Sequence, residues 1–91
     1  MQQYIVVYET KNAINRQRLM QCLQNLGILY NQVLSNSYFC ITNIQREELY
    51  NRIRMTIQDD SDLLLIADFN SRSISGWLPN SSVTWYKEHI Q

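Results

Sequence analysis

The sequence has little of several residues on which common functional sites are built. Its 91 residues include two glycines, two cysteines, one histidine and one proline. There is consequently no glycine-rich loop for a phosphate, no zinc-ligand spacing, and no Ser, His and Asp set for nucleophilic catalysis. Cys22 and Cys40 stand far apart within apolar patterns, which favours two buried free thiols over a disulfide or a metal pair.

An excess of charge of either sign is also missing. Eight Lys and Arg balance eight Asp and Glu, so the formal net charge is zero. A global basic field is therefore excluded, and any surface for nucleic acid has to be a local patch. No apolar run approaches the length of a membrane span, and Met1-Gln2-Gln3 lacks the basic start of a signal peptide. We expect a cytoplasmic protein without a membrane partner.

What the chain does have is a set of short segments rich in β-branched and aromatic residues. Residues 3–9 are almost wholly apolar, which predicts an inner strand buried on both faces of a sheet. Residues 38–42 have the same character, and residues 63–69 form a third such strand. The mixed segment 28–35 precedes a short Ser and Asn turn, so it predicts a hairpin with 38–42.

Helical spacing appears in two segments between these strands. Leu19, Leu23 and Leu26 predict a helix over residues 14–26, with Asn12 and Asn15 as candidate N-caps. Gly27 follows at the place where a helix end favours a positive φ.

A second helix is predicted around Leu49, Ile53 and Ile57, with Asn43 as its cap. The turn that follows, residues 59–62, is acidic. It lacks the glycine and the distal glutamate of a calcium loop, so we favour a solvated turn over a cation site.

The C-terminal part consists of a polar loop and a short helix. Pro79 excludes a central strand at that point, and residues 83–90 have helical character. Trp85 and His89 share a face of this helix, where the histidine is read as a favourable end charge rather than an acid or base.

The order of elements predicts an α+β, ferredoxin-like βαββαβ fold. Right-handed crossovers place the first and third strands in the middle of a four-stranded antiparallel sheet. Both helices cover one face, and we expect the other face to be bare and apolar, so that a second copy or a ligand covers it. The chain forms one domain, 1–91, with a core of 1–69 and an extension of 70–91.

Several segments resemble the CRISPR-associated Cas-two family of small ferredoxin-like proteins. They are the stretch 4–10, the helix 15–27 with its Arg16-Gln17-Arg18-Leu19 opening, the hairpin 34–41 and the strand 62–69. The turn with Trp77 and the terminal helix are similar to the SinR-like, non-CRISPR relatives of that family.

This resemblance implies homodimers that form through the sheets, binding of RNA or DNA, and in some members a metal-dependent nuclease. The metal carboxylate of the family is an Asp directly after a Tyr at the end of the first strand. Here Tyr8 is followed by Glu9, whose oxygens lie one methylene farther out. Glu9 is thus the candidate catalytic and metal-binding residue, for Mg²⁺ or Mn²⁺ shared between two subunits. The alternative is a solvated carboxylate, or one paired with Lys11 or Arg16.

Lys11, Arg16, Arg18 and Arg72 are candidates for a nucleic-acid-binding rim. The alternative is that arginines on a helix exterior simply keep the surface soluble. Tyrosines 4, 8, 30 and 38 could stack bases on an open sheet, although core or dimer contacts are the favoured interpretation.

Three hypotheses about function follow. The favoured one is a homodimeric, non-catalytic nucleic-acid-binding or adaptor protein, because Glu9 departs from the family motif and the net charge is zero. The second is a metal-dependent endonuclease that uses Glu9 from both subunits. The third is a purely oligomeric structural module.

Overall fold

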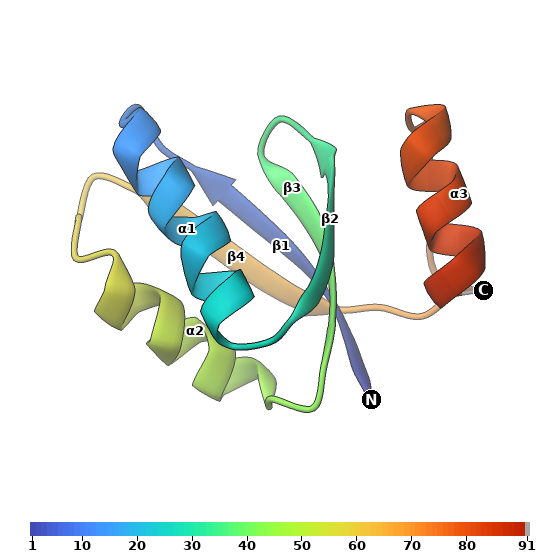
Figure 1. Cartoon of the computed structure of the whole chain (residues 1–91), viewed down its shortest axis with the longest axis horizontal. Helices are drawn as coiled ribbons and strands as arrows, with labels where there is room; N and C mark the ends of the chain where they lie inside the picture. The colour runs from blue at the N-terminus through green and yellow to red at the C-terminus, as the bar shows by residue number, and fades with distance from the viewer. Residues whose placement is uncertain (91) are drawn as a thin grey trace.

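The computed structural model of the protein describes residues 1–90. Strands and helices follow the predicted βαββαβ order, and a third helix comes after them (Figure 1). No helix among residues 1–90 is long and apolar enough to cross a membrane. The elements are β1 (Gln2–Glu9), α1 (Ala13–Asn25), β2 (Leu29–Leu34), β3 (Ser37–Thr42), α2 (Arg46–Thr56), β4 (Leu63–Asp68) and α3 (Asn80–His89).

The four strands form one antiparallel sheet in the order β2-β3-β1-β4. The prediction that the first and third strands lie in the middle is therefore confirmed. In this register Tyr4 of β1 stands between Cys40 of β3 and Asp68 of β4. Because side chains alternate along a strand, every second residue of β1 points to the same face.

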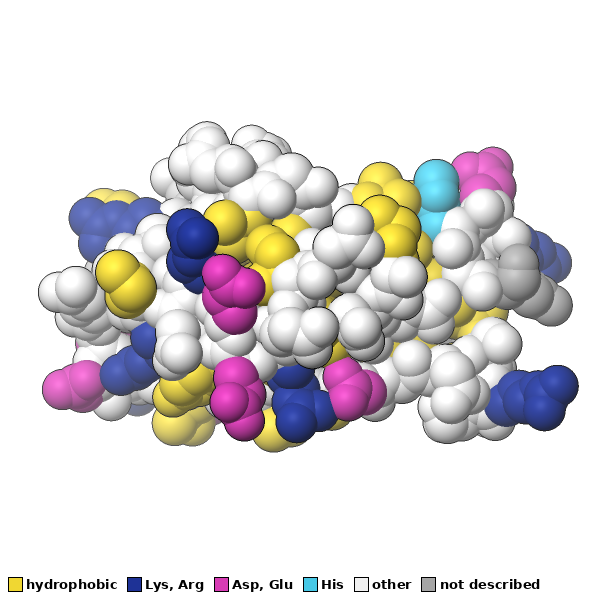
Figure 2. Space-filling model, turned by 90° about the horizontal axis from the view of Figure 1, so that it is seen from below, with side chains coloured by type: hydrophobic (Ala, Val, Ile, Leu, Met, Phe, Trp, Pro, Cys, Tyr) yellow, Lys and Arg dark blue, Asp and Glu magenta, His cyan; other side chains and the backbone are white. Residues whose placement is uncertain are grey.

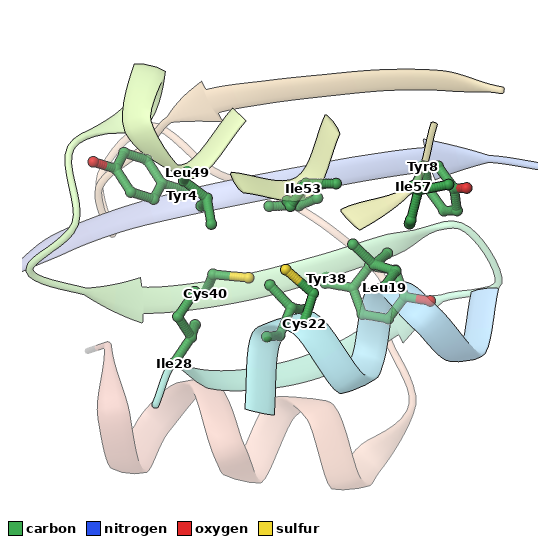
Figure 3. Close-up of a cluster of buried hydrophobic side chains, with 12 residues drawn as sticks. Tyr4, Tyr8, Leu19, Cys22, Ile28, Tyr38, Cys40, Leu49, Ile53 and Ile57 are labelled. Carbon is green, nitrogen blue, oxygen red and sulfur yellow. The ribbon is translucent and has the colours of Figure 1, made fainter. Parts of the chain in front are cut away.

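Helices α1 and α2 cover one face, which we call the helix face (Figure 1). The main hydrophobic core lies between this face and the two helices (Figure 3). Tyr4, Tyr8 and Tyr38 belong to it, and each is at most 4% exposed. Base stacking on these three tyrosines is therefore excluded, and the core interpretation is confirmed for them. The other fully buried members include Val6, Leu19, Leu23, Cys40, Leu49 and Ile53.

The opposite face, which we call the far face, is not bare as the sequence predicted. Helix α3 packs on its β2–β3 half (Figure 1). Phe39 of β3 is 1% exposed, and its ring centroid lies 6.4 Å from that of Trp85 and 5.8 Å from that of Tyr86. Phe69 closes the same cluster at 5.1 Å. Aromatic side chains carry a large apolar area, and this provides the physical reason why the terminal helix docks here.

The β1–β4 half of the far face stays open. Leu63 and Leu65 of β4 are 63% and 62% exposed, and Ile5, Val7 and Ala67 beside them are half-buried. We call these five residues the β1–β4 strip. It is the part of the predicted uncovered surface that remains after α3 has docked.

The predicted N-cap residues are confirmed in part. Asn12 caps α1, because its Oδ1 accepts a hydrogen bond from the Ile14 N–H at 2.9 Å. Asn15 was wrong as a cap, since it lies inside α1 and is buried. Asn43 was wrong as well: α2 begins at Arg46, and its N-cap position is Gln45. The prediction was wrong because the chain stays non-helical for two residues after Asn43.

Both cysteines are free and buried, as predicted. Burial raises the pKa of the Cys40 thiol to about 12, so this thiol is protonated at neutral pH.

Gly27 ends α1 with a φ of 68°, which confirms its predicted role. We expect Gly27→Ala to lower the free energy of unfolding by about 1–2 kcal/mol, because a side chain disfavours the left-handed region. Space is not the cause, since a Cβ at this position would meet nothing within 4 Å. Gly76→Ala is the control, as its Cβ would meet only ordinary contacts with Leu78. Urea unfolding measures both; equal effects would contradict the argument.

Candidate functional site

A buried polar network occupies the end of the sheet where β1 stops and α1 begins. The Tyr8 hydroxyl donates a hydrogen bond to Asp62 Oδ2, and the Thr10 hydroxyl donates to Asp62 Oδ1 at 2.7 Å. The Asn15 side-chain amide donates to Asp62 Oδ2 at 3.0 Å and to Asp59 Oδ2 at 2.9 Å. One carboxylate thus joins β1, α1 and the segment that leads into β4.

The solvated-turn prediction for residues 59–62 is wrong for Asp62. This residue is 7% exposed, and Asn15 is 2% exposed. By contrast, the side chain of Asp60 is fully exposed, as the prediction requires. The sequence carried one signal that could have separated the two: a tyrosine on the buried face of β1 needs a partner for its hydroxyl.

The pKa values of two members of this network, Tyr8 and Asp59, are shifted by their surroundings. Burial, and then the hydrogen bond to Asp62, raise the pKa of Tyr8 far above its usual value, so the phenol remains a donor. Hydrogen bonds from the hydroxyl and the backbone N–H of Ser61 lower the pKa of Asp59. The network is therefore a structural joint with its donors and acceptors matched.

Glu9 lies at the end of β1, exposed and on the far face opposite Leu63. Asp62, the buried carboxylate at this end, accepts its hydrogen bonds on the helix face. Within residues 1–90, no three His, Cys, Asp or Glu side chains lie where they could hold a metal ion together. One chain places the single exposed carboxylate of Glu9 on the far face here, so the predicted site shared between two subunits needs Glu9 from a second copy.

Three of the four predicted rim residues lie at this same end of the molecule. Lys11, Arg16 and Arg18 are exposed, at or within the first turns of α1. None of them forms an ion pair with any of residues 1–90. Arg18 makes one long hydrogen bond, 3.4 Å, from its Nη1 to Asn15 Oδ1.

Arg72 does not join this rim. It lies in the loop after β4, which starts beside the first residues of β1, because the Phe69 N–H donates to Gln3 O at 3.2 Å. In an antiparallel pair the end of β4 meets the start of β1, so Arg72 is placed at the opposite end of the sheet. The prediction of one rim with four cations is therefore corrected to three.

Other arginines have carboxylate partners. Arg46 contacts Asp68 at 2.6 Å, and Arg54 contacts Asp60 at 3.3 Å. Seen from below, acidic and basic side chains alternate on the surface and form no single field (Figure 2). On the face that Figure 2 shows, the charges are mixed. Lys11, Arg16 and Arg18 share the lack of an ion pair with Arg72 and Lys87 among residues 1–90.

The far face also carries an apolar groove that the sequence analysis missed. Its volume is about 640 Å³, and Ile5, Phe39, Leu78 and Val83 are among the residues that line it. Trp77 stands at its wall and is 99% exposed. The groove shares Ile5 with the β1–β4 strip, so the two apolar surfaces are continuous.

Comparison with known proteins gives a likeness of fold. No family model matches the chain, and no curated protein matches it. Among solved structures, it is similar to the crystal structure of hypothetical protein TT1823 from Thermus thermophilus. The TM-score is 0.60 at 22% sequence identity, over 86% of this chain and 94% of that chain. A likeness at this level of identity shows the α+β, ferredoxin-like fold and nothing about activity.

The contribution of Asp62 to stability can be tested by substitutions in residues 59–62. We expect Asp62→Asn to lower the free energy of unfolding by about 2–3 kcal/mol, since a charged acceptor of several hydrogen bonds is replaced. Asp60→Asn is the matched control; it removes only an exposed pair with Arg54 and is expected to cost at most about 0.5 kcal/mol. Chemical denaturation at neutral pH measures both variants. If Asp62→Asn is as stable as Asp60→Asn, the joint does not hold the fold.

Proposed function

We propose that this protein is a homodimeric nucleic-acid-binding or adaptor module without catalysis, of the Cas-two or SinR-like type. One observation carries the proposal: Lys11, Arg16 and Arg18 are each exposed at the start of α1 and have no ion-pair partner among residues 1–90. Three such cations near one end of a neutral chain, which we call the basic patch, supply the local charge that binding to phosphates requires.

The position of the patch supports contact with a nucleic-acid backbone. Arg16 and Arg18 project from the first turns of α1, and guanidinium groups are well suited to bind phosphate oxygens. Contacts of this kind bind phosphates and do not read sequence. The proposed ligand is accordingly RNA or DNA recognised through its backbone.

The β1–β4 strip supports the homodimer. Leu63 and Leu65 are large apolar side chains on an edge strand, and each is more than 60% exposed. Exposed apolar edges invite pairing or stacking with another chain, and a twofold axis would bury the strip against its own copy. Trp77 and the far-face groove would extend the buried area.

Glu9 supports the non-catalytic form. It is a single carboxylate on the far face of its own chain, next to the strip, and the neighbouring acidic turn directs Asp62 inward to Tyr8 and Asn15. In a dimer that forms through the strip, Glu9 would lie at the edge of the interface as a charged residue beside the apolar contact.

The nucleic-acid patch can be tested by its salt dependence. We expect wild type to bind a labelled duplex at low salt, and the triple variant Lys11→Gln, Arg16→Gln, Arg18→Gln to bind more weakly. The slope of log K against log salt should fall by roughly 2 to 3, because each phosphate contact releases counterions. Arg72→Gln with Lys87→Gln, in the loop after β4 and in α3, is the control. Fluorescence anisotropy measures binding; equal slopes for both variants would contradict the proposal.

The dimer can be tested with a charge placed in the strip. We expect Leu65→Glu to halve the solution mass measured by sedimentation, because a carboxylate would be buried in an apolar seam. Met55→Glu is the control, since Met55 is 71% exposed on α2, away from the strip. A monomeric wild type, or a dimer unaffected by Leu65→Glu, would contradict this interface.

A further inference from the structure

A cleft of about 250 Å³ runs between α1 and α2, outside the main core. Its rim carries two guanidinium groups from different helices, Arg18 of α1 and Arg52 of α2. Two carboxamides, Gln21 and Asn25, line the α1 side. No carboxylate is among the lining residues. A concave site with cations and neutral donors is complementary to an anion.

The two arginines are held weakly by the protein itself. Arg18 has the long hydrogen bond to Asn15 already described. Arg52 lies 3.8 Å from Glu48, and both side chains are more than half exposed. An exposed pair of this kind contributes about 0–1 kcal/mol. A doubly charged ligand can therefore displace these contacts.

The floor of the cleft strengthens attraction to an anion. Cys22 is 6% exposed, and Leu26 packs half-buried against the core. An apolar floor lowers the local dielectric response, so charges at the rim interact more strongly than they would in open water. The Thr56 hydroxyl donates to Arg52 O at 2.9 Å, so we do not count it among the donors for a ligand.

The carboxamides add directed donors. Gln21 Nε2 donates to Asn25 Oδ1 at 3.1 Å, which orients the pair and leaves hydrogens on both amide nitrogens for a ligand. Guanidinium groups bind phosphate oxygens through two parallel N–H bonds, a geometry that Lys cannot reproduce.

We propose that the cleft between α1 and α2 binds a phosphate group, clamped by Arg18 and Arg52. The inference rests on the proposed function for the source of that phosphate. Arg18 also belongs to the basic patch, so a nucleic acid bound there would continue into the cleft. The phosphate belongs either to the backbone of that nucleic acid or to its 5′ end.

Inorganic phosphate and pyrophosphate test the cleft by itself. In the wild-type chain, NMR titration should shift the side-chain amide signals of Gln21 and Asn25. Arg52→Gln should weaken the fitted affinity about tenfold, the loss expected for a charged hydrogen bond. Arg54→Gln, two positions along α2 and outside the lining, should leave it unchanged. Absence of shifts with both anions, or equal losses in both variants, would overturn the assignment.

Oligonucleotides then identify the source. If a 5′-phosphate strengthens binding to wild type but not to Arg52→Gln, the cleft holds the terminal phosphate. If Arg52→Gln weakens binding with and without that group, and lowers the salt slope by about one, it holds a backbone phosphate. Unchanged binding of both oligonucleotides by Arg52→Gln would overturn the proposal. If wild type binds neither oligonucleotide but still shows the amide shifts with phosphate or pyrophosphate, the proposed function is refuted. The phosphate site would then still be supported.

Discussion

The fold depends on one buried carboxylate. Asp62 accepts hydrogen bonds from Tyr8, Thr10 and Asn15, so the end of β1, the first turns of α1 and the entry to β4 meet at one point. Removing a charge from water is costly unless its hydrogen bonds are replaced, and here three donors replace them. The same joint holds the start of α1, with its unpaired cations, in a fixed position above the sheet.

A second constraint acts on the opposite face. Phe39 could not remain in water beside the other apolar residues of the far face, and the aromatic side chains of α3 cover it. Because α3 has only ten residues, it covers the β2–β3 half and leaves Leu63 and Leu65 exposed. The extension thus leaves the β1–β4 strip, which lies beside Glu9, uncovered on this face.

The tertiary structure decides which charged side chains are paired and which are not. The chain is neutral, and Arg46 and Arg54 are matched by Asp68 and Asp60. Arg16 and Arg18 of α1 remain unmatched, and Arg18 lines the cleft between the two helices together with Arg52. A neutral protein can present such cations because several of its acidic residues, among them Asp60, Asp62 and Asp68, are engaged elsewhere, in ion pairs or in the buried network.

The sequence by itself determined the elements, their order and the central place of β1 and β3, because periodicity and β-propensity are local and β1 and β3 are almost wholly apolar. The role of Gly27 at the end of α1 could also be predicted, since a positive φ is a property of one residue. The tertiary structure alone decided that Asp62 is buried, that α3 covers Phe39 and that Arg72 stands apart from α1. The physical reason is that the surroundings of a polar or surface side chain depend on groups distant in the chain.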